Sequence, residues 1–239
     1  MNKYEIISKL EEFAPLELAE AWDCSGWLIE TAKNDISKVM LCLTPTLDVI
    51  NQAKLENCDL IISHHPMFFV PFFTPQIDIY SMHTNFDKTK GGTTDILIDV
   101  LFSSDFAKNN KVNIDNISSN DYLRIVTLED SFNFSKFIDL LRYISPNLRY
   151  VNNKKLDQVK KIAFCCGSGS EFIDLSRELG ADIYVTGDLK FHTALDSEIA
   201  LCDLGHFESE IVTLKTIEKL IKSSKLDIVY AKEKSPFIY

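Results

Sequence analysis

The sequence predicts an α/β protein, because apolar strand-like runs alternate with helical segments along most of its 239 residues. Two of these runs, DLII at 59–62 and KIAFCC at 161–166, are almost continuously apolar, as is typical of strands covered on both faces. The five histidines each follow such a run. Strand ends are where open α/β sheets build their binding sites, so the histidines are the best indication of function.

The first half opens with a helix expected at 4–13, where Tyr4, Ile7, Leu10 and Phe13 form one apolar stripe. Acidic residues lie among these apolar ones, so the segment does not read as a signal peptide. Further along, strands are expected at 39–44, 59–63 and 77–82, and helices at 47–56 and 94–101.

In the second half, strands are expected at 123–127, 161–166, 183–186, 201–204 and 228–231, and helices at 134–143, 171–179, 193–200 and 208–222. The segment 102–121 is rich in Asn, Asp and Ser and reads as a connection. We therefore expect domains at 1–105 and 122–239, joined by a linker at 106–121. Candidate metal ligands come from both parts, which predicts a site in the cleft between them.

The composition excludes some classes of function. The formal net charge of -10 disfavours nucleic-acid binding, which needs a basic face. No apolar run approaches the roughly 20 residues that span a membrane, so a cytoplasmic protein without membrane contact is expected. The six cysteines form no CxxC pair, and we expect buried, reduced thiols in the strand-like runs.

The motif SHHP at 63–66 is the first candidate for metal binding. Neutral imidazole is the commonest protein ligand for metals. In an extended strand His64 and His65 would point to opposite faces, but Pro66 disfavours continuation of the ladder. Both imidazoles could then turn toward one cleft. The alternative is one core histidine and one exposed histidine.

Two further pairs have a spacing of four residues. His83 and Asp87 place a carboxylate near imidazoles, a donor set that suits Zn, Mn, Fe, Co or Ni. Asp87 could instead cap a turn, and His83 could orient a ligand. His206 and Glu210 would share one face of a helix that begins near Phe207. The alternative is that Glu208 and Glu210 are first-turn acids stabilised by the helix dipole.

Two loops that follow strands are weaker candidates. Gly167 and Gly169 permit a tight turn whose N–H groups could hold an anion, or only a plain turn. After the strand at 183–186, Lys190 could hold a phosphate and His192 could transfer a proton. Both could equally be solvated loop residues.

The chain resembles the Nif-three-like proteins, whose bacterial members are known as GTP cyclohydrolase 1 type 2 homologues. The matching motifs, in order, are AEAWDCSGWLI, DLIISHHPMFF, HTNFDKTKGGTTDIL, KIAFCCGSGS, GADIYVTGDLKFH and DLGHFESE. Three features depart from the family pattern: a short connection between HHPMFF and HTNFD, Thr44 in place of an acidic residue, and Cys24–Ser25 after WD.

The resemblance implies two interlocked α/β domains and a ring-shaped homohexamer. It also implies a dinuclear site with two divalent metal ions per chain. The ligands that it implies, with Glu210 bridging both ions, are His64, His65, Asp87, His206 and Glu210. The departures touch none of these positions.

The activity that the resemblance implies is hydrolytic opening of the GTP purine ring, with release of formate. The substrate would be a nucleotide, His192 or His83 would act as proton shuttle, and Lys190 would hold phosphate. A metal-dependent phosphoester hydrolase would use the same ligands. A third reading is a metal-binding adaptor or metal-delivery protein without turnover, because a fold does not establish catalysis.

Overall fold

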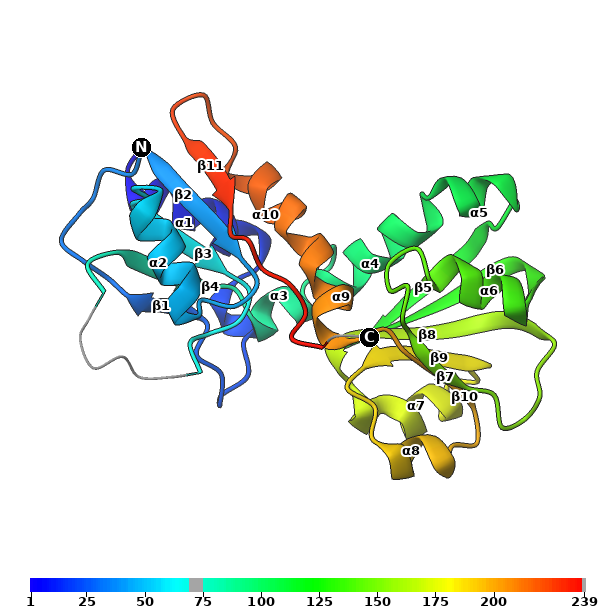
Figure 1. The fold of residues 1–239 in the computed structure, drawn as a ribbon. Coiled ribbons are helices and arrows are strands. Elements are labelled where there is room, and N and C mark those ends of the chain that lie inside the picture. Colours follow the sequence, from blue (N-terminus) through cyan, green and yellow to red (C-terminus); the bar gives the residue numbers. More distant parts are fainter. Residues whose placement is uncertain (69–74, 238–239) are drawn as a thin grey trace. The chain divides into compact units, whose positions relative to one another are not determined.

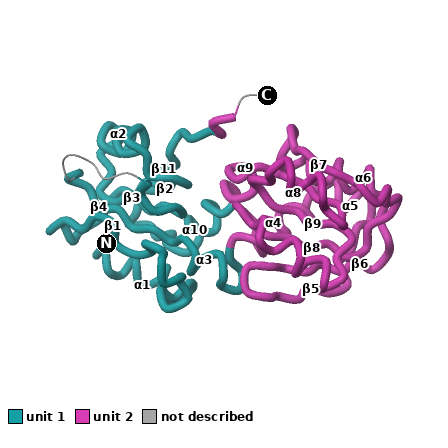
Figure 2. The backbone as a smooth tube through the Cα atoms, turned by 90° about the horizontal axis from the view of Figure 1, so that it is seen from below, with its two compact units in different colours: residues 1–92, 213–234 teal, residues 93–212, 235–239 magenta. Residues whose placement is uncertain are grey.

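The computed structural model describes residues 1–68 and 75–237 (Figure 1). The chain divides into two compact units, coloured separately in Figure 2. Unit 1 consists of Met1–Gly92 and Thr213–Lys234, and unit 2 of Thr93–Val212 and Ser235–Tyr239. The chain thus builds most of unit 1, passes through unit 2, and returns to complete unit 1.

Unit 1 is a five-stranded sheet with helices. Its elements are α1 (Lys3–Phe13), the 3-10 turn η1 (Leu16–Leu18), β1 (Gly26–Ile29), β2 (Lys38–Cys42), α2 (Leu47–Leu55), β3 (Leu60–Ser63), β4 (Asp78–Ser81), α3 (Thr84–Lys88), α10 (Leu214–Ile221) and β11 (Asp227–Tyr230). The strand order is β1-β4-β3-β2-β11. All neighbouring strands are parallel except β1, which pairs antiparallel with β4 at one edge.

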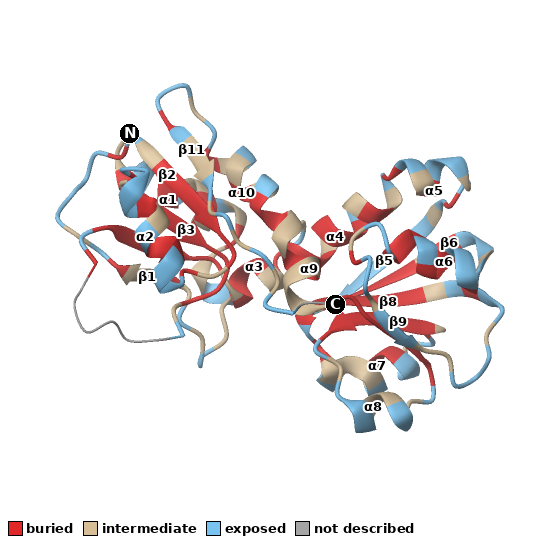
Figure 3. Ribbon diagram, in the orientation of Figure 1, coloured by how far each residue is buried: buried red, intermediate tan, exposed pale blue. Residues whose placement is uncertain are grey.

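Burial explains why the apolar runs of unit 1 form its central strands. Every residue of β3 and β4 is buried (Figure 3). Helix α2 contributes Val49, Ile50 and Ala53 to a core that includes Met40 and Ile61 of the sheet. Parallel strands buried in this way are those that read as unbroken apolar runs.

Unit 2 is built on a six-stranded mixed sheet. Its elements are α4 (Thr93–Phe102), α5 (Asp105–Asn109), β5 (Ile114–Asn120), β6 (Leu123–Asn133), α6 (Phe134–Leu141), β7 (Arg149–Val151), β8 (Gln158–Ser168), η2 (Ser170–Phe172), α7 (Ile173–Glu178), β9 (Ile183–Gly187), α8 (Phe191–Leu195), β10 (Ala200–Asp203), α9 (His206–Glu210) and the turn η3 (Ile211–Thr213) at its end. The strand order is β5-β6-β8-β9-β10-β7, with β8, β9 and β10 parallel.

Both faces of the second sheet are covered. Leu97 of α4 and Phe137 of α6 belong to one core with Ile162 and Val185 of the sheet. On the other face, Tyr184 lies in a second cluster against which residues of η2 and α7 pack. The predicted fold class, α/β with two interlocked domains, is confirmed: β11 near the C-terminus pairs with β2 in unit 1.

Each predicted strand overlaps a strand of the structure, but among the strands of the described residues β1, β5 and β7 were not predicted. The helix expected at 193–200 is α8, which ends at Leu195 because Ala200 already belongs to β10. The helix expected at 208–222 is interrupted by the turn Ile211–Thr213, so that α9 and α10 are separate helices.

The expected linker at 106–121 was wrong, since it contains most of α5 and the whole of β5. Strand β5 pairs antiparallel with β6 at the edge of the second sheet. Five of its seven residues are polar, which matches their position on an edge strand where six of the seven are exposed. The expected limits at 105 and 122 differ from those of the units, which divide the chain after Gly92 and again after Val212.

The six cysteines are free thiols, and the five that lie in or beside strand-like runs are buried. Within residues 1–68 and 75–237, no helix combines the length and the apolar character needed to cross a membrane.

Candidate metal centre

Three histidines of unit 1 lie together at the carboxyl ends of two neighbouring strands of its sheet. His64 and His65 follow β3 and His83 follows β4, which is the parallel neighbour of β3. Because the carboxyl ends of neighbouring parallel strands lie side by side, this topology brings the three side chains together. One ring nitrogen of each lies within 4.8 Å of the others.

Backbone and hydroxyl contacts hold His64 and His65 in place. The hydroxyl of Ser81 donates to the carbonyl of His64 at 2.7 Å, and that of Ser63 donates to the carbonyl of His65 at 2.7 Å. The ring centroids of His64 and His65 lie 4.9 Å apart, and each ring also contacts that of His83. The two imidazoles thus do not lie on opposite faces, although they are adjacent in sequence.

The Nδ1 atoms of His64 and His65 are engaged by the protein. His64 Nδ1 donates to the carbonyl of Met82 at 2.7 Å, which requires its hydrogen to be on Nδ1 and leaves Nε2 as the lone-pair atom. His65 Nδ1 lies 2.7 Å from the hydroxyl of Thr44. Metal-ligating histidines are usually oriented in this way through the nitrogen that does not bind the ion.

Asp87 adds a carboxylate to the first set. It lies in α3, and its Oδ1 is 3.6 Å from Nε2 of His64. The backbone N–H of Asp87 donates to the carbonyl of His83, so one turn of helix places both side chains on the same side. The spacing of four residues is therefore a helical spacing.

Asp23 is a candidate functional residue that the sequence reasoning missed. Its carboxylate accepts bonds from Nδ1 of His83 (2.8 Å), from the hydroxyls of Ser25 and Thr84 (2.6 Å each) and from the backbone N–H of Cys24 (2.7 Å). Burial raises the pKa of Asp23, but these hydrogen bonds outweigh it and hold the pKa well below its usual range. Asp23 is thus an anion that orients His83. The only signal for it was its place in the motif WDCSG.

The second set lies in unit 2, where a turn of two residues, Leu204 and Gly205, separates β10 from the start of α9 at His206. Nε2 of His206 is 3.1 Å from a carboxylate oxygen of the buried Glu210, and Nδ1 is 2.8 Å from Oδ2 of Asp188. Asp188 follows β9, the parallel neighbour of β10. This set repeats the arrangement of the first, with Nδ1 held by the protein and Nε2 beside a carboxylate.

Gly167 and Gly169 shape the space around Glu210 and do not form an anion site. The N–H of Gly167 donates to the hydroxyl of Ser209 and that of Gly169 to the hydroxyl of Thr186, so these groups are already used. Gly167 has φ +62°, and a Cβ there would lie 2.3 Å from Oε1 of Glu210. Only glycine lets the end of β8 approach this carboxylate so closely.

The charge of the second set favours a bound cation. Burial lowers the pKa of His206, but its bonds to Asp188 and Glu210 outweigh burial and raise the pKa to about 10. The bond from His206 in turn lowers the pKa of Asp188. A divalent ion on Nε2 would take the place of the proton that this pair of carboxylates retains. The donors therefore fit a metal ion.

Of the three candidate catalytic residues, one lies beside the candidate metal ligands of unit 1 and two lie on the surface of unit 2. His83 lies with the first set. Lys190 and His192 are exposed at the start of α8, where the ring of His192 contacts that of Phe191. In this loop it is Asp188 that bonds to His206. The assembly of both sets into one dinuclear site stays a prediction.

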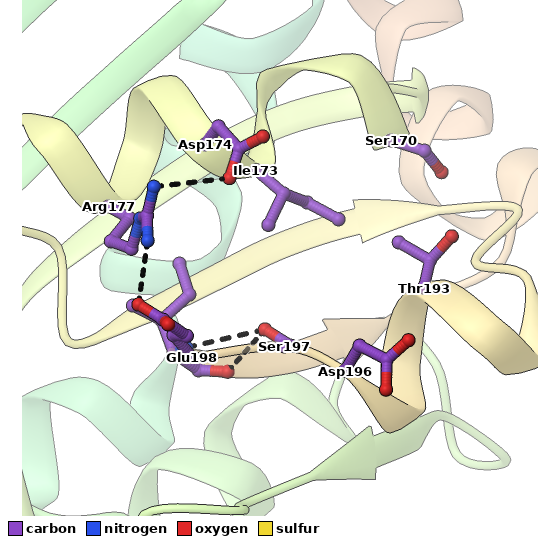
Figure 4. Close-up of a pocket in the computed structure, with 9 residues that line it drawn as sticks. Ser170, Ile173, Asp174, Arg177, Thr193, Asp196, Ser197 and Glu198 are labelled. Carbon is purple, nitrogen blue, oxygen red and sulfur yellow. Dashed lines mark hydrogen bonds and ion pairs between the residues drawn. The ribbon is translucent and has the colours of Figure 1, made fainter.

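Unit 2 also has a polar pocket of about 280 Å³ between α7 and α8 (Figure 4). Arg177 lies on its wall and pairs with both Asp174 and Glu198, so its charge is neutralised. None of the sequence-predicted site residues lines this pocket. We therefore do not assign the chemistry to it.

Comparison with known proteins gives consistent matches over the whole chain. A family model described as Duf34/NIF3 (NGG1p interacting factor 3) matches residues 1–236. The GTP cyclohydrolase 1 type 2 homolog of Clostridium perfringens is 31% identical, with 99% of each chain covered. The protein of the same name from Campylobacter jejuni is 30% identical over the full length of both. GTP cyclohydrolase 1 type 2 of Helicobacter pylori J99 is 29% identical, with 86% of each covered.

Solved structures show the same fold. Reduced HcgD from Methanocaldococcus jannaschii superposes with a TM-score of 0.81 at 26% identity, with 98% of each chain covered. A Bacillus cereus protein related to NIF3 gives a TM-score of 0.82 at 20% identity, covering 100% of this chain and 99% of that one.

Proposed function

Because the chain belongs to the Duf34/NIF3 family, we propose that it is a metal-dependent hydrolase of the GTP cyclohydrolase 1 type 2 kind. The resemblance inferred from the motifs is confirmed at the level of the family. The proposed reaction is hydrolytic opening of the purine ring of GTP, with release of formate. Two Helicobacter pylori relatives carry the enzyme name without the word homolog, which supports this choice.

The observation that carries the proposal is the common orientation of three imidazoles. In His64, His65 and His206, Nδ1 is held by a carbonyl, a hydroxyl or a carboxylate of the protein. For His64 and His206, Nε2 lies beside a carboxylate, that of Asp87 or that of Glu210. Two sets in one chain share the engaged Nδ1 and the carboxylate beside Nε2. This repetition favours a metal-binding function over a chance cluster of core histidines.

We assign His64, His65 and Asp87 to one set of ligands and His206 and Glu210 to the other, for two divalent ions per chain. Nitrogen and carboxylate donors suit Zn, Mn, Fe, Co or Ni. Such ions would supply Lewis-acid activation of water and of the purine ring.

His83 is the preferred residue for proton transfer. Asp23 accepts the bond from its Nδ1, which leaves Nε2 as the basic nitrogen of a carboxylate–imidazole pair. His192 is the second candidate, on the exposed helix α8. Lys190, next to it, would hold a phosphate of the nucleotide.

The first test is the metal content of the full chain, purified without chelator. We expect about two transition-metal ions per chain, and their loss in a His64→Ala/His206→Ala double variant. Lys160→Ala, an exposed residue of the same chain, is the control and should retain the metal. Little metal in the wild type after reconstitution would end the proposal.

The second test is release of formate from GTP by the metal-loaded protein. We expect formate from the wild type and none above background from the double variant. A screen of phosphoesters against the same pair of proteins separates ring opening from phosphoester hydrolysis, which would use the same ligands. Turnover of a phosphoester with GTP intact would replace the proposed reaction.

A non-catalytic role is the competing proposal, because the family description names an interacting factor. It predicts bound metal that exchanges readily and no turnover of GTP or of any phosphoester.

We further propose a cytoplasmic homohexamer, for which the free thiols of the chain support a reducing compartment. Light scattering on the purified protein measures the assembly directly.

A further inference from the structure

Unit 2 carries a second pocket, of about 200 Å³, lined by residues of the edge strand β7, of helix α8 and of the loop before α8. Its lining includes charged, aromatic and apolar side chains, namely Arg149, Tyr150, Leu189, Lys190, Phe191 and Asp203. None of them belongs to the two sets of candidate metal ligands. Leu189 and Lys190, however, directly follow Asp188, which holds His206.

Two aromatic rings are exposed at this pocket. Phe191 is 73% exposed and Tyr150 is 47% exposed. The ring of Phe191 lies 5.3 Å from that of His192, and the ring of Tyr150 lies 5.9 Å from that of Phe134, measured between centroids. Exposed aromatic faces beside a pocket are typical of sites where a flat ligand ring stacks.

The charge at the pocket is positive, although the chain carries a net charge of -10. Arg149 and Asp203 form an ion pair and offset each other, so the net positive charge of the lining comes from Lys190. The guanidinium of Arg149 is held by Asp203 and donates to the carbonyl of Leu189 at 3.2 Å. A local excess of positive charge on an acidic protein selects an anionic ligand.

The pocket is braced by the same carboxylate that shapes the approach to His206. Asp203 is buried, and it accepts from the backbone N–H of Leu189 at 3.2 Å and from that of Gly205 at 2.9 Å. Gly205 directly precedes His206, the first residue of α9. The loop that lines the pocket and the turn that presents His206 are therefore anchored at one point.

We infer that this pocket binds a nucleotide, with the base against Phe191 and Tyr150 and a phosphate at Lys190 and Arg149. The choice of a guanine nucleotide rests on the proposed function, whereas the aromatic and cationic character of the site does not. Two exposed rings recognise a planar heterocycle, and the adjacent cations recognise its phosphate.

The test is calorimetric titration of the full-length protein with GTP, guanosine and inorganic tripolyphosphate. Phe191→Leu should weaken binding of GTP and guanosine by about fivefold or more and leave tripolyphosphate unchanged. Lys190→Gln should weaken binding of GTP and tripolyphosphate by about tenfold and leave guanosine unchanged. Two exposed residues of the same unit provide matched controls, Tyr143→Leu and Lys160→Gln, and should bind as the wild type does.

The inference is overturned if the wild type binds none of the three probes, or if the pocket variants bind GTP as tightly as their controls do. Formate release that persists with unaltered GTP affinity in those variants would disprove nucleotide binding at the pocket, and with it the phosphate contact of Lys190, but would leave the proposed reaction standing. If the probes bind in the expected pattern but no formate is released, nucleotide binding at the pocket is supported and the proposed function is disproved.

Discussion

Thr44 shows how a single hydroxyl can set the position of a candidate metal ligand. It contacts Nδ1 of His65 at 2.7 Å and is itself fixed at its backbone. The carboxylate of Glu233 accepts the N–H groups of Leu43 at 2.7 Å and of Thr44 at 2.9 Å. Burial raises the pKa of Glu233, and these two bonds oppose that rise. A residue near the C-terminus thus supports the end of β2 beside His65.

We expect Thr44→Val to weaken metal binding by about tenfold or more, because His65 loses the group that orients its ring. Metal affinity, measured by competition with a chromophoric chelator, is the readout. Thr193→Val, a partly exposed threonine of unit 2, is the control. Equal affinity in the two variants would show that the hydroxyl does not position His65.

The buried carboxylate of Asp23 predicts a pH dependence of stability. Because its folded pKa is depressed, its contribution to stability is fully present above the ordinary value of 3.8 and is lost as the pH falls below that value. Asp23→Asn removes this contribution and leaves the hydrogen-bond donors around it poorly matched. We expect the variant to lose about 1–3 kcal/mol of unfolding free energy at pH 7.

The measurement is urea unfolding of wild type and Asp23→Asn between pH 7 and pH 3. The difference between the two proteins should shrink as the pH falls through 4 and below. Asp130→Asn, an exposed carboxylate, controls for the change in net charge. A difference that is independent of pH would mean that Asp23 is not held as an anion.

At the scale of elements, the short helix α9 depends on the glycine that lies against it. A Cβ on Gly167 would lie 2.3 Å from Oε1 of Glu210 and 3.4 Å from Nε2 of His206. We expect Gly167→Ala to cost about 1–3 kcal/mol through its positive φ and to displace Glu210. Gly180→Ala is the matched control, since Gly180 has φ +79° but only a lysine side chain near it, at 3.6 Å.

Thermal unfolding and metal content together read out this prediction. Both variants should unfold at lower temperature, and only Gly167→Ala should lose metal. Retention of full metal content by a folded Gly167→Ala protein would contradict the role given to Glu210.

The central elements could be predicted from the sequence and the edge elements could not. Strands such as β3 and β9 are buried along their whole length, so their apolar runs identify them. Strand β5 is exposed at six of its seven positions and reads as a polar loop, because pairing with β6 defines it. Strand β7 has three residues, which is too short for any pattern.

The same limit applies to the candidate site. His206 and Glu210 could be paired from the sequence, because a spacing of four residues is a local signal. Asp23 and His83 are 60 residues apart, and Asp188 and His206 are 18 apart, so only the fold brings each pair together. Sequence reasoning found the histidines and missed the carboxylates that orient them.

For the whole molecule, the two units differ in how continuous they are. Residues 93–212 form nearly all of unit 2, whereas unit 1 needs 213–234 in addition to 1–92. We expect a fragment of residues 93–212 to unfold cooperatively on its own, as an independent domain does. The fragment 1–92 lacks β11 beside β2 and should not fold alone.

Circular dichroism during thermal unfolding, with amide spectra of each fragment, measures this difference. Adding a fragment of residues 213–234 to the fragment 1–92 should restore a cooperative transition. Cooperative unfolding of residues 1–92 alone would show that α10 and β11 are dispensable.

The return of the chain to unit 1 has a consequence for the order of synthesis. As the polypeptide leaves the ribosome, β2 is made early, but its neighbour β11 is made after every other strand of the described residues. The edge of β2 therefore stays open while residues 43–226 are translated, and an open edge invites pairing with other nascent chains. The later-made unit 2 can close first, and the N-terminal sheet is completed only after β11 has been made.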